Sequence, residues 1–298
     1  MSQWFRQAGS TSRDGFDVAI DPREAGWDHT GLYVATLAPG ESRELATGEF
    51  EWLVLPLAGE CRVECDSRSV QLDGRAGPFA GPSDFAYVPK SSNLLVVSTG
   101  GARIALPHAK ASRSLPFRRV GPEEVTTELR GAGQATREVR NFGTPDVLDA
   151  DSIIACEVVT PSGNWSSWPP HKHDEHHQGR ESVLEEIYYF EMRVEGDAPK
   201  SDVSRSATAM GYQRVYGTKD RPIDVIAEVR SGDVVLVPHG WHGPAMAPPG
   251  YDMYYLNVMA GPGPTREWLI TDDPDHAWVR EAWAGQKLDP RLPWGGQG

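Results

Sequence analysis

The sequence predicts an all-β protein. Short runs of apolar and β-branched residues recur along its 298 residues, and residues that favour turns separate them. Each run is too short for an independent helix and has the side chains that favour strands. The 31 glycines and 24 prolines exceed the usual combined share of about 12%, which fits many tight turns. The predicted strands are Leu32–Leu37, Glu51–Leu57, Phe85–Val88, Asn93–Ser98, Ile153–Val159, Ile187–Val194, Asp224–Val229, Val234–Val237 and Met253–Met259.

One helix is predicted, close to the C-terminus. Asp273 can cap it, and Pro274 suits the first helical position. Trp278 and Ala282 then lie one turn apart on the same face. We expect a short C-terminal helix that ends near Trp283 and packs on the β body.

A weak internal repeat predicts two related β domains. Ser83–Lys90 and Gly232–His239 share one pattern, an acidic turn, then four strand residues, then a proline. In each half a glutamate, Glu51 or Glu186, opens a strand with aromatic residues, and we align these two glutamates with each other.

The boundary between the two domains is placed within Thr126–Gly143. This stretch is polar, contains glycine and has few residues that favour strands. The chain then divides into an N-terminal domain of residues 1–130 and a C-terminal domain of residues 131–298.

The net charge of −13 argues against a nucleic-acid or anionic-membrane partner, because phosphate groups are bound by basic surfaces. No stretch approaches the ~20 apolar residues of a membrane-spanning helix. The first residues lack the basic and apolar pattern of a secretory signal. We therefore expect a small-molecule partner and neither a nucleic acid nor a membrane.

The three cysteines are predicted to be reduced. Cys61 and Cys65 lie in one predicted strand, where four residues span about 13 Å, too far for a disulfide. Together with Cys156 they fit a cytoplasmic protein. A metal or redox role is the alternative.

Four residues, His171, His173, Glu186 and His242, are predicted to bind one divalent metal ion. His171 and His173 stand two residues apart, so in a strand they project to the same side. A carboxylate on a neighbouring strand and a histidine after a glycine turn complete a set of nitrogen and oxygen ligands. The order His-x-His, Glu, Gly-x5-Pro-x-Gly and a closing His resembles the metal motif of the cupin barrel, a double-stranded β-helix or jelly roll.

This sequence departs from the commonest form of that motif in two places. Asp174–Leu184 lengthens the gap between the histidine pair and the glutamate, and the spacing from Pro238 to the last histidine is one residue shorter. Glu185 is the alternative carboxylate ligand. We favour Glu186 because it directly precedes Ile-Tyr and aligns with Glu51.

The first domain is expected to keep the barrel pattern without the metal. By the offsets of the repeat, Thr36 and Ala38 stand where the second domain has its histidine pair, and Asn93 stands where it has the last histidine. The chain is thus predicted to be a bicupin whose second barrel alone binds a metal.

Three imidazoles and one carboxylate leave open positions on the metal ion for substrate. The ion would act as a Lewis acid on a carbonyl or hydroxyl oxygen. Zinc suits this ligand set best, and manganese, iron and nickel are compatible with it. With iron or copper, the same ligands would support a dioxygenase.

The second half also resembles the 5-deoxy-glucuronate isomerases of myo-inositol catabolism, relatives of the pectin-pathway uronate ketol-isomerases. The resemblance covers most of residues 150–280 and implies the aldose–ketose isomerisation of 5-deoxy-D-glucuronate to 5-dehydro-2-deoxy-D-gluconate. The matching stretches are Pro169–Asp174, Leu184–Tyr189, Gln213–Tyr216, Gly232–Pro238, Pro248–Asp252, Tyr254–Pro262 and Asp272–His276.

Three further residues are candidates for contacts with such a substrate. Arg214 could bind the carboxylate, because a guanidinium forms paired hydrogen bonds with it. Tyr255 and Asn257 share one face of a predicted strand and would hydrogen-bond sugar hydroxyls if that face is inward. Glu181 and Glu185 are considered as the general base, and the choice stays open.

Three other functions are weighed against this isomerase. They are the pectin-pathway ketol-isomerase that acts on 5-dehydro-4-deoxy-D-glucuronate, a cupin dioxygenase, and a sugar-binding, storage or regulatory cupin without activity. In every case we expect a homo-oligomer, because exposed strand edges favour association.

Overall fold

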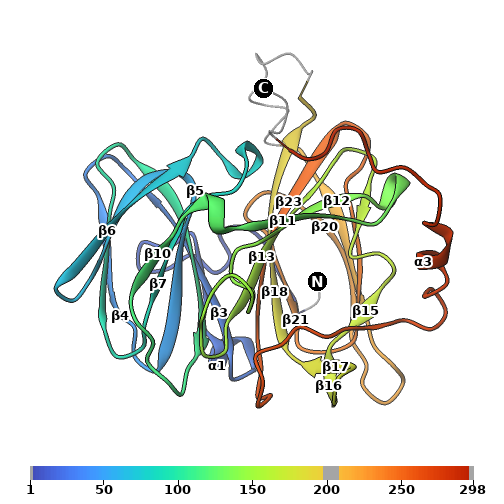
Figure 1. The fold of residues 1–298 in the computed structure, drawn as a ribbon, viewed down its shortest axis with the longest axis horizontal. Helices are drawn as coiled ribbons and strands as arrows, with labels where there is room; N and C mark the ends of the chain where they lie inside the picture. The colour runs from blue at the N-terminus through green and yellow to red at the C-terminus, as the bar shows by residue number, and fades with distance from the viewer. Residues whose placement is uncertain (1–2, 197–207, 295–298) are drawn as a thin grey trace.

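The computed structural model describes residues 3–196 and 208–294, and it is built almost wholly of β-strands (Figure 1). All nine predicted strands are present, with ends shifted by a few residues. The all-β class is confirmed. Two β bodies lie side by side, one formed mainly by the first half of the chain and one by the second (Figure 1).

The first body is a nine-stranded sheet whose main path is β10-β7-β5-β9-β3-β2. Its longest strand, β5, changes partners along its length: it pairs with β7 and β9 near its start and with β6 and β8 near its end. The strands are β2 (Val18–Ile20), β3 (Thr30–Leu37), β4 (Ser42–Ala46), β5 (Phe50–Cys65), β6 (Arg68–Arg75), β7 (Phe85–Val88), β8 (Asn93–Val97), β9 (Ala102–Lys110) and β10 (Arg118–Val120).

The second body has two facing sheets. A seven-stranded sheet runs β1-β21-β18-β23-β13-β12-β11, and a six-stranded sheet runs β20-β19-β22-β15-β24 with β14 beside β22. A separate hairpin joins β16 to β17. The strands are β1 (Phe5–Arg6), β11 (Thr126–Arg130), β12 (Arg137–Asn141), β13 (Ile154–Thr160), β14 (Trp165–Ser166), β15 (His171–Lys172), β16 (Asp174–His177), β17 (Glu181–Val183), β18 (Glu185–Val194), β19 (Gly211–Tyr216), β20 (Asp224–Val229), β21 (Val234–Val237), β22 (Trp241–Met246), β23 (Tyr251–Ala260) and β24 (Thr271–Asp272).

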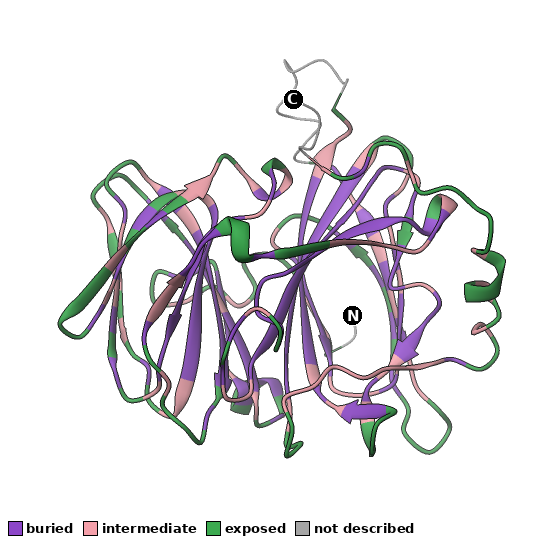
Figure 2. Ribbon diagram, in the orientation of Figure 1, coloured by how far each residue is buried: buried purple, intermediate pink, exposed green. Residues whose placement is uncertain are grey.

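The two bodies share a buried junction. One continuous apolar cluster contains Leu32 and Leu55 from the first body together with Ile187 and Leu256 from the second. Buried ion pairs also cross the junction, among them Arg75 with Glu157. The strands between the bodies are buried, whereas exposed residues lie on outer loops, on helix α3 and along outer strands such as β4 and β20 (Figure 2).

The stretch Thr126–Gly143 is not poor in strands, contrary to the prediction. It forms β11 and β12, which pair with each other and join the large sheet of the second body through β13. Their charged residues mask a strand pattern, because they face a cavity and a buried ion pair instead of an apolar core. The division of the chain at residue 130 stays a prediction.

Helical structure is sparse among the described residues. It comprises α1 (Pro22–Ala25), α3 (Val279–Ala282) and three single turns, η1 (Pro78–Ala80), η2 (Pro122–Glu124) and η3 (Gly133–Ala135).

A short C-terminal helix is present, but it starts later than predicted. Asp273 does not cap it. The Asp273 carboxylate instead accepts hydrogen bonds from the backbone N–H of Asp275 and from the Tyr216 hydroxyl. Residues 274–278 therefore form turns before α3 begins.

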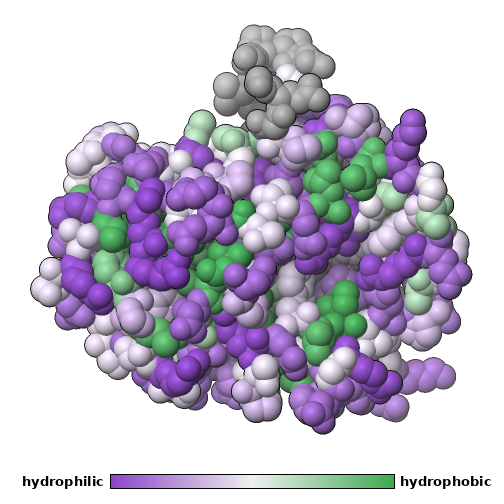
Figure 3. Space-filling view, in the orientation of Figure 1, coloured by the Kyte–Doolittle hydropathy of each residue, from purple (hydrophilic) through white to green (hydrophobic). Residues whose placement is uncertain are grey.

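The outer surface is largely polar. On the face shown in Figure 3, hydrophilic residues predominate and hydrophobic ones gather in small groups. None of the helices in the described ranges has the length and apolarity needed to span a bilayer. Cys61, Cys65 and Cys156 are buried free thiols, in accord with the predicted absence of disulfides between them.

Candidate metal centre

Three histidine side chains converge between the two sheets of the second body. His171 on β15 and His242 on β22 are direct partners across antiparallel strands, and their ring centroids are 4.5 Å apart. The ring of His173, two residues after His171, lies 4.7 Å from that of His242. The alternation of side chains thus brings His171 and His173 to one side, as the sequence predicted.

Each of the three imidazoles has the same hydrogen-bonding arrangement. The Nδ1 atom of His171 lies 3.3 Å from the carbonyl oxygen of Pro169, that of His173 lies 3.3 Å from Leu184, and that of His242 lies 3.1 Å from Gly240. A carbonyl oxygen only accepts, so each Nδ1 carries the hydrogen. Nε2 is therefore the nitrogen that each ring leaves for a metal ion, as in histidines whose other nitrogen is held by a carbonyl oxygen.

Glu186 on β18 completes the cluster from the opposite sheet. Its Oε2 atom is 3.2 Å from Nε2 of His173 and 3.1 Å from Nε2 of His242, and the ligand atoms of these three residues lie within 4.8 Å of one another. Burial alone would raise the pKa of this carboxyl group, but His242 and His173 lower it overall. Glu186 is therefore held as a carboxylate.

The cluster fits a divalent metal ion. His171, His173, Glu186 and His242 are all buried, and they offer three nitrogens and one oxygen, the donor types that zinc and related ions accept. The buried Nε2 atom of His242 is close to Glu186, at 3.1 Å, but forms no hydrogen bond of suitable geometry among the described residues. Burial, together with His242 and His173, lowers the pKa of His171 well below its usual value, so this ring stays neutral and available.

Glu185 points to the opposite side of β18 and away from the cluster. Its carboxylate accepts hydrogen bonds of 2.9 Å from the backbone N–H groups of Asp28, His29 and Thr30 in the first body. Alternation along the strand therefore separates the two adjacent glutamates by function.

The structure corrects the alignment of Glu51 with Glu186. Glu186 is the strand partner of Val237, whereas the equivalent Val88 in the repeat is the partner of Trp52. Glu51 instead matches Glu185. It accepts hydrogen bonds from the backbone N–H groups of residues 151, 152 and 153 in the second body. Each body thus contributes one glutamate that binds three consecutive backbone N–H groups of the other body.

In the first body, aromatic side chains occupy the place of the metal cluster. Trp52, at the position of Glu186, stacks on the ring of His108 at a centroid distance of 3.9 Å. Burial lowers the pKa of His108 to about 4, so this ring is neutral.

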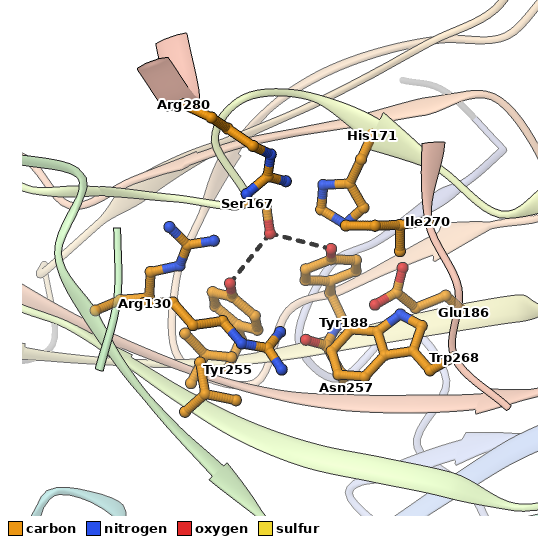
Figure 4. Close-up of a pocket in the computed structure, with 13 residues that line it drawn as sticks. Arg130, Ser167, His171, Glu186, Tyr188, Tyr255, Asn257, Trp268, Ile270 and Arg280 are labelled. Carbon is orange, nitrogen blue, oxygen red and sulfur yellow. Dashed lines mark hydrogen bonds between the residues drawn. The ribbon is translucent and has the colours of Figure 1, made fainter. Parts of the chain in front are cut away.

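A cavity of about 250 Å³ opens beside the metal cluster (Figure 4). Its wall includes His171 and Glu186 and also the predicted Tyr255 and Asn257, whose shared strand face is therefore inward. The other lining residues are Arg130, Arg137, Val139, Val158, Ser167, Tyr188, Trp268, Ile270 and Arg280.

Polar groups line this cavity between the metal cluster and the arginines. The Ser167 hydroxyl lies 3.2 Å from that of Tyr188 and 3.1 Å from that of Tyr255 (Figure 4). The Nδ2 atom of Asn257 and the Nε1 atom of Trp268 are buried without hydrogen-bond partners in the described part of the chain. Such groups are suited to bind the hydroxyl groups of a sugar.

The structure does not bring Arg214 to the cavity. Its guanidinium pairs with Asp224 and lies over the ring of Tyr216 on the outer side of β19. Inward and outward residues alternate along this strand, and Arg214 occupies an outward position. The carboxylate-binding role predicted for it has no support in this geometry.

Neither glutamate considered as the general base faces the cavity. Glu181 accepts a hydrogen bond from Lys172 at 2.8 Å within the β16–β17 hairpin, and Glu185 binds the first body. Lys172 itself points away from the metal cluster, as predicted. His176 and His177 are exposed on the same hairpin.

Sequence reasoning missed most of the polar cavity wall. Tyr188 stands two residues after Glu186 and shares its strand face, so alternation could have identified it. Arg130 and Arg137 fall in the stretch interpreted as a linker, Trp268 lies on irregular chain, and Arg280 lies in the short helix α3.

The fold and this site define a cupin. Oxalate decarboxylase of Bacillus subtilis superimposes with a TM-score of 0.60 over 91% of this chain and 80% of its own, at 12% identity, which shows a shared fold. The family model described as "KduI/IolB family" matches residues 4–279, and the chain belongs to this family.

Named relatives agree with this assignment. A 5-deoxy-glucuronate isomerase of Geobacillus thermodenitrificans is 38% identical over 95% of this chain and 97% of its own length. That of Bacillus subtilis strain 168 is 36% identical over 83% of this chain and 86% of its own. The crystal structure of an IolB-like protein from Salmonella typhimurium matches with a TM-score of 0.82 and 36% identity, over 93% of this chain and 98% of that one. The protein is an isomerase of this family.

Proposed function

We propose that the protein converts 5-deoxy-D-glucuronate to 5-dehydro-2-deoxy-D-gluconate with the help of a divalent metal ion held by His171, His173, Glu186 and His242. The observation that carries this proposal is the uniform arrangement of the three imidazoles. All three place Nδ1 against a backbone carbonyl, and the Nε2 atoms of His173 and His242 lie 3.2 and 3.1 Å from Glu186, beside a polar cavity that His171 also lines. The names of the relatives support the choice of reaction.

The reaction moves a hydrogen atom from C2 of the aldose to C1 through an enediol. A divalent ion supplies Lewis acidity that stabilises negative charge on the C1 and C2 oxygens. The hydroxyl groups of Ser167, Tyr188 and Tyr255 and the amide of Asn257 are placed to orient the sugar hydroxyls. Burial raises the pKa of Tyr255 to about 12, so it acts as a neutral hydrogen-bond donor.

The test is proton NMR of the purified protein with 5-deoxy-D-glucuronate in D₂O, before and after treatment with a chelator. We expect conversion to the ketose, loss of conversion on chelation and recovery when metal is restored. The variants His171→Ala and His242→Ala should lose bound metal and activity together. Full activity in either metal-free variant would refute the metal-dependent reaction.

The remaining assignments are part of the same proposal. We propose zinc as the metal, the cytoplasm as the location and a homo-oligomer as the assembly, in the degradation of myo-inositol. Metal analysis of the purified protein and sedimentation velocity test the first and third. Conversion of 5-dehydro-4-deoxy-D-glucuronate in place of the 5-deoxy substrate would move the enzyme to the pectin pathway.

A further inference from the structure

The cavity wall contains one buried guanidinium that has no anionic partner. Arg137 begins β12 and is 7% exposed. Its Nη1 atom donates to the carbonyl oxygens of Ala135, at 3.1 Å, and Trp168, at 3.5 Å. Its other N–H groups have no acceptor among the described residues, and no described carboxylate forms an ion pair with it.

Other described arginines with largely enclosed side chains have a carboxylate or several carbonyl groups as partners, although the Nη2 atom of Arg140 is buried without a hydrogen bond. Arg75 pairs with Glu157, and Arg140 pairs with Glu138 at 2.7 Å. Arg266 has no carboxylate, but it donates to three separate backbone carbonyls. Arg137 differs from these because no carboxylate accompanies it: its guanidinium donates to two carbonyl oxygens and lies 5.9 Å from the centre of the Trp283 ring, and the residue lines the cavity.

The surroundings oppose the charge of Arg137. Arg130 is its direct partner across β11 and β12, and like charges in that position are destabilising. Arg280 lines the same cavity. Arg130 is already paired with Glu128 at 2.7 Å, and Arg280 with Asp272 at 2.7 Å. The positive charge that remains uncompensated in the cavity is therefore that of Arg137.

A buried charge without a partner is costly, so a bound anion would relieve an unfavourable arrangement. Arg130, the strand partner of Arg137, lies across the cavity from Glu186, with Tyr188 and Tyr255 between them (Figure 4). A sugar acid has the matching layout, because its carboxylate and its carbonyl carbon are at opposite ends.

We propose that Arg137 binds the carboxylate of the substrate and makes the cavity selective for sugar acids over uncharged sugars. For the identity of the ligand this inference rests on the proposed function, and it replaces Arg214 with Arg137 as the carboxylate-binding residue. Arg137 is a substrate-binding residue, and the guanidinium supplies the paired hydrogen bonds that suit a carboxylate.

The experiment is a calorimetric titration of D-glucuronate and of its uncharged amide, D-glucuronamide, into protein of known metal content. The wild type should bind the acid about 10- to 100-fold more tightly than the amide, the range for a charged hydrogen bond. Arg137→Met should lose this preference by weakening only the acid, and Arg137→Lys should retain part of it. Arg214→Met is the matched control and should behave as wild type.

Two results would overturn the inference. One is equal affinity of the wild-type protein for acid and amide, which needs no variant to fold. The other is an equal loss of both ligands in Arg137→Met with unchanged metal content and thermal stability. Because binding is measured without turnover, acid-selective binding by a protein that isomerises nothing would refute the proposed reaction and leave this inference standing. Isomerisation by a protein that binds acid and amide equally would support the proposed reaction and refute the role of Arg137.

Discussion

At the scale of single residues, Glu185 and Glu186 show how one strand separates two tasks. They are neighbours on β18, yet their carboxylates lie on opposite sides of the sheet. Glu186 lies against the imidazoles of His173 and His242, and Glu185 accepts hydrogen bonds from three backbone N–H groups of the first body. Buried carboxylates persist only where such partners compensate their charge.

Substitution of these two glutamates should therefore give opposite results. We expect Glu186→Gln to weaken metal binding by more than the roughly 10- to 100-fold that loss of an outer-shell partner costs. We expect Glu185→Gln to leave metal content unchanged and to lower the free energy of unfolding by about 1.5–3 kcal/mol, because charged hydrogen bonds are weakened. Metal analysis and urea unfolding of both variants test this, and metal loss in Glu185→Gln alone would reverse the ligand assignment.

A second residue-scale prediction concerns His108. Burial lowers its pKa to about 4 in the folded protein, whereas an unfolded chain has a value near 6.5. Between these values the unfolded state binds more protons, so stability falls as the pH falls. The loss approaches about 3 kcal/mol once the pH reaches 4.

The variant His108→Phe keeps a ring in the stack with Trp52 and removes the titrating group. Its free energy of unfolding should depend less on pH between 6.5 and 4.5 than that of the wild type. His177→Gln is the control, because this histidine is exposed on the β16–β17 hairpin. An unchanged pH dependence in His108→Phe would show that His108 does not contribute.

At the scale of elements, β22 and the segment before β15 are fitted to each other at Gly243. This residue follows the ligand His242 and has a φ of +107°. A Cβ atom there would lie 1.8 Å from the carbonyl oxygen of Ser167, whose hydroxyl lines the cavity. Glycine is required because both the backbone angle and the close approach exclude a side chain.

Two glycines allow these effects to be separated. Gly250 has a similar φ of +95°, but nothing lies within 4 Å of its added Cβ atom. Both Gly243→Ala and Gly250→Ala should carry a backbone cost of about 1–3 kcal/mol. Only Gly243→Ala should lose further stability and also lose metal, as thermal unfolding and metal analysis would show. Equal behaviour of the two variants would contradict a role for the close approach.

Strands whose side chains pack in the apolar core could be predicted from the sequence. Strands whose side chains mainly make polar contacts could not. The strand Tyr251–Ala260 is buried along nearly all its length and is mostly apolar or aromatic, with Asp252 and Asn257 as exceptions. In Thr126–Arg130 and Arg137–Asn141 the same extended backbone carries charges that face a cavity or an ion pair. At Asp273 the carboxylate divides between a local bond to the N–H of Asp275 and a tertiary bond to Tyr216, and the helix begins only at Val279.

The site follows the same rule. The spacing of His171 and His173 is a local property of a strand, so sequence alone identified the pair. Arg214 and Arg137 are both arginines on strands, and which of them faces inward depends on the register of each strand against its neighbours in the sheet, such as that of β19 against β22. That register is not written in the neighbourhood of either residue.

At the scale of the whole molecule, the two bodies are bound by reciprocal contacts. Glu51 accepts hydrogen bonds from backbone N–H groups just before β13, and Glu185 accepts them from backbone N–H groups at the start of β3. Ion pairs and a common apolar cluster add to these contacts. The metal cluster is on one body only, yet the strand that bears Glu186 is anchored through its neighbour Glu185 to the other body.

The order of strands in the large sheet of the second body has a consequence for synthesis. Its two outermost strands, β1 and β11, lie before residue 131, and its five inner strands follow. During synthesis the two edge strands therefore leave the ribosome before the five inner strands with which they pair. A fragment that begins at residue 131 would present two bare edges, at β21 and β12, and such edges recruit other chains. The strand order therefore places strands that are synthesised late, such as β23, between strands that are synthesised earlier, such as β1 and β11.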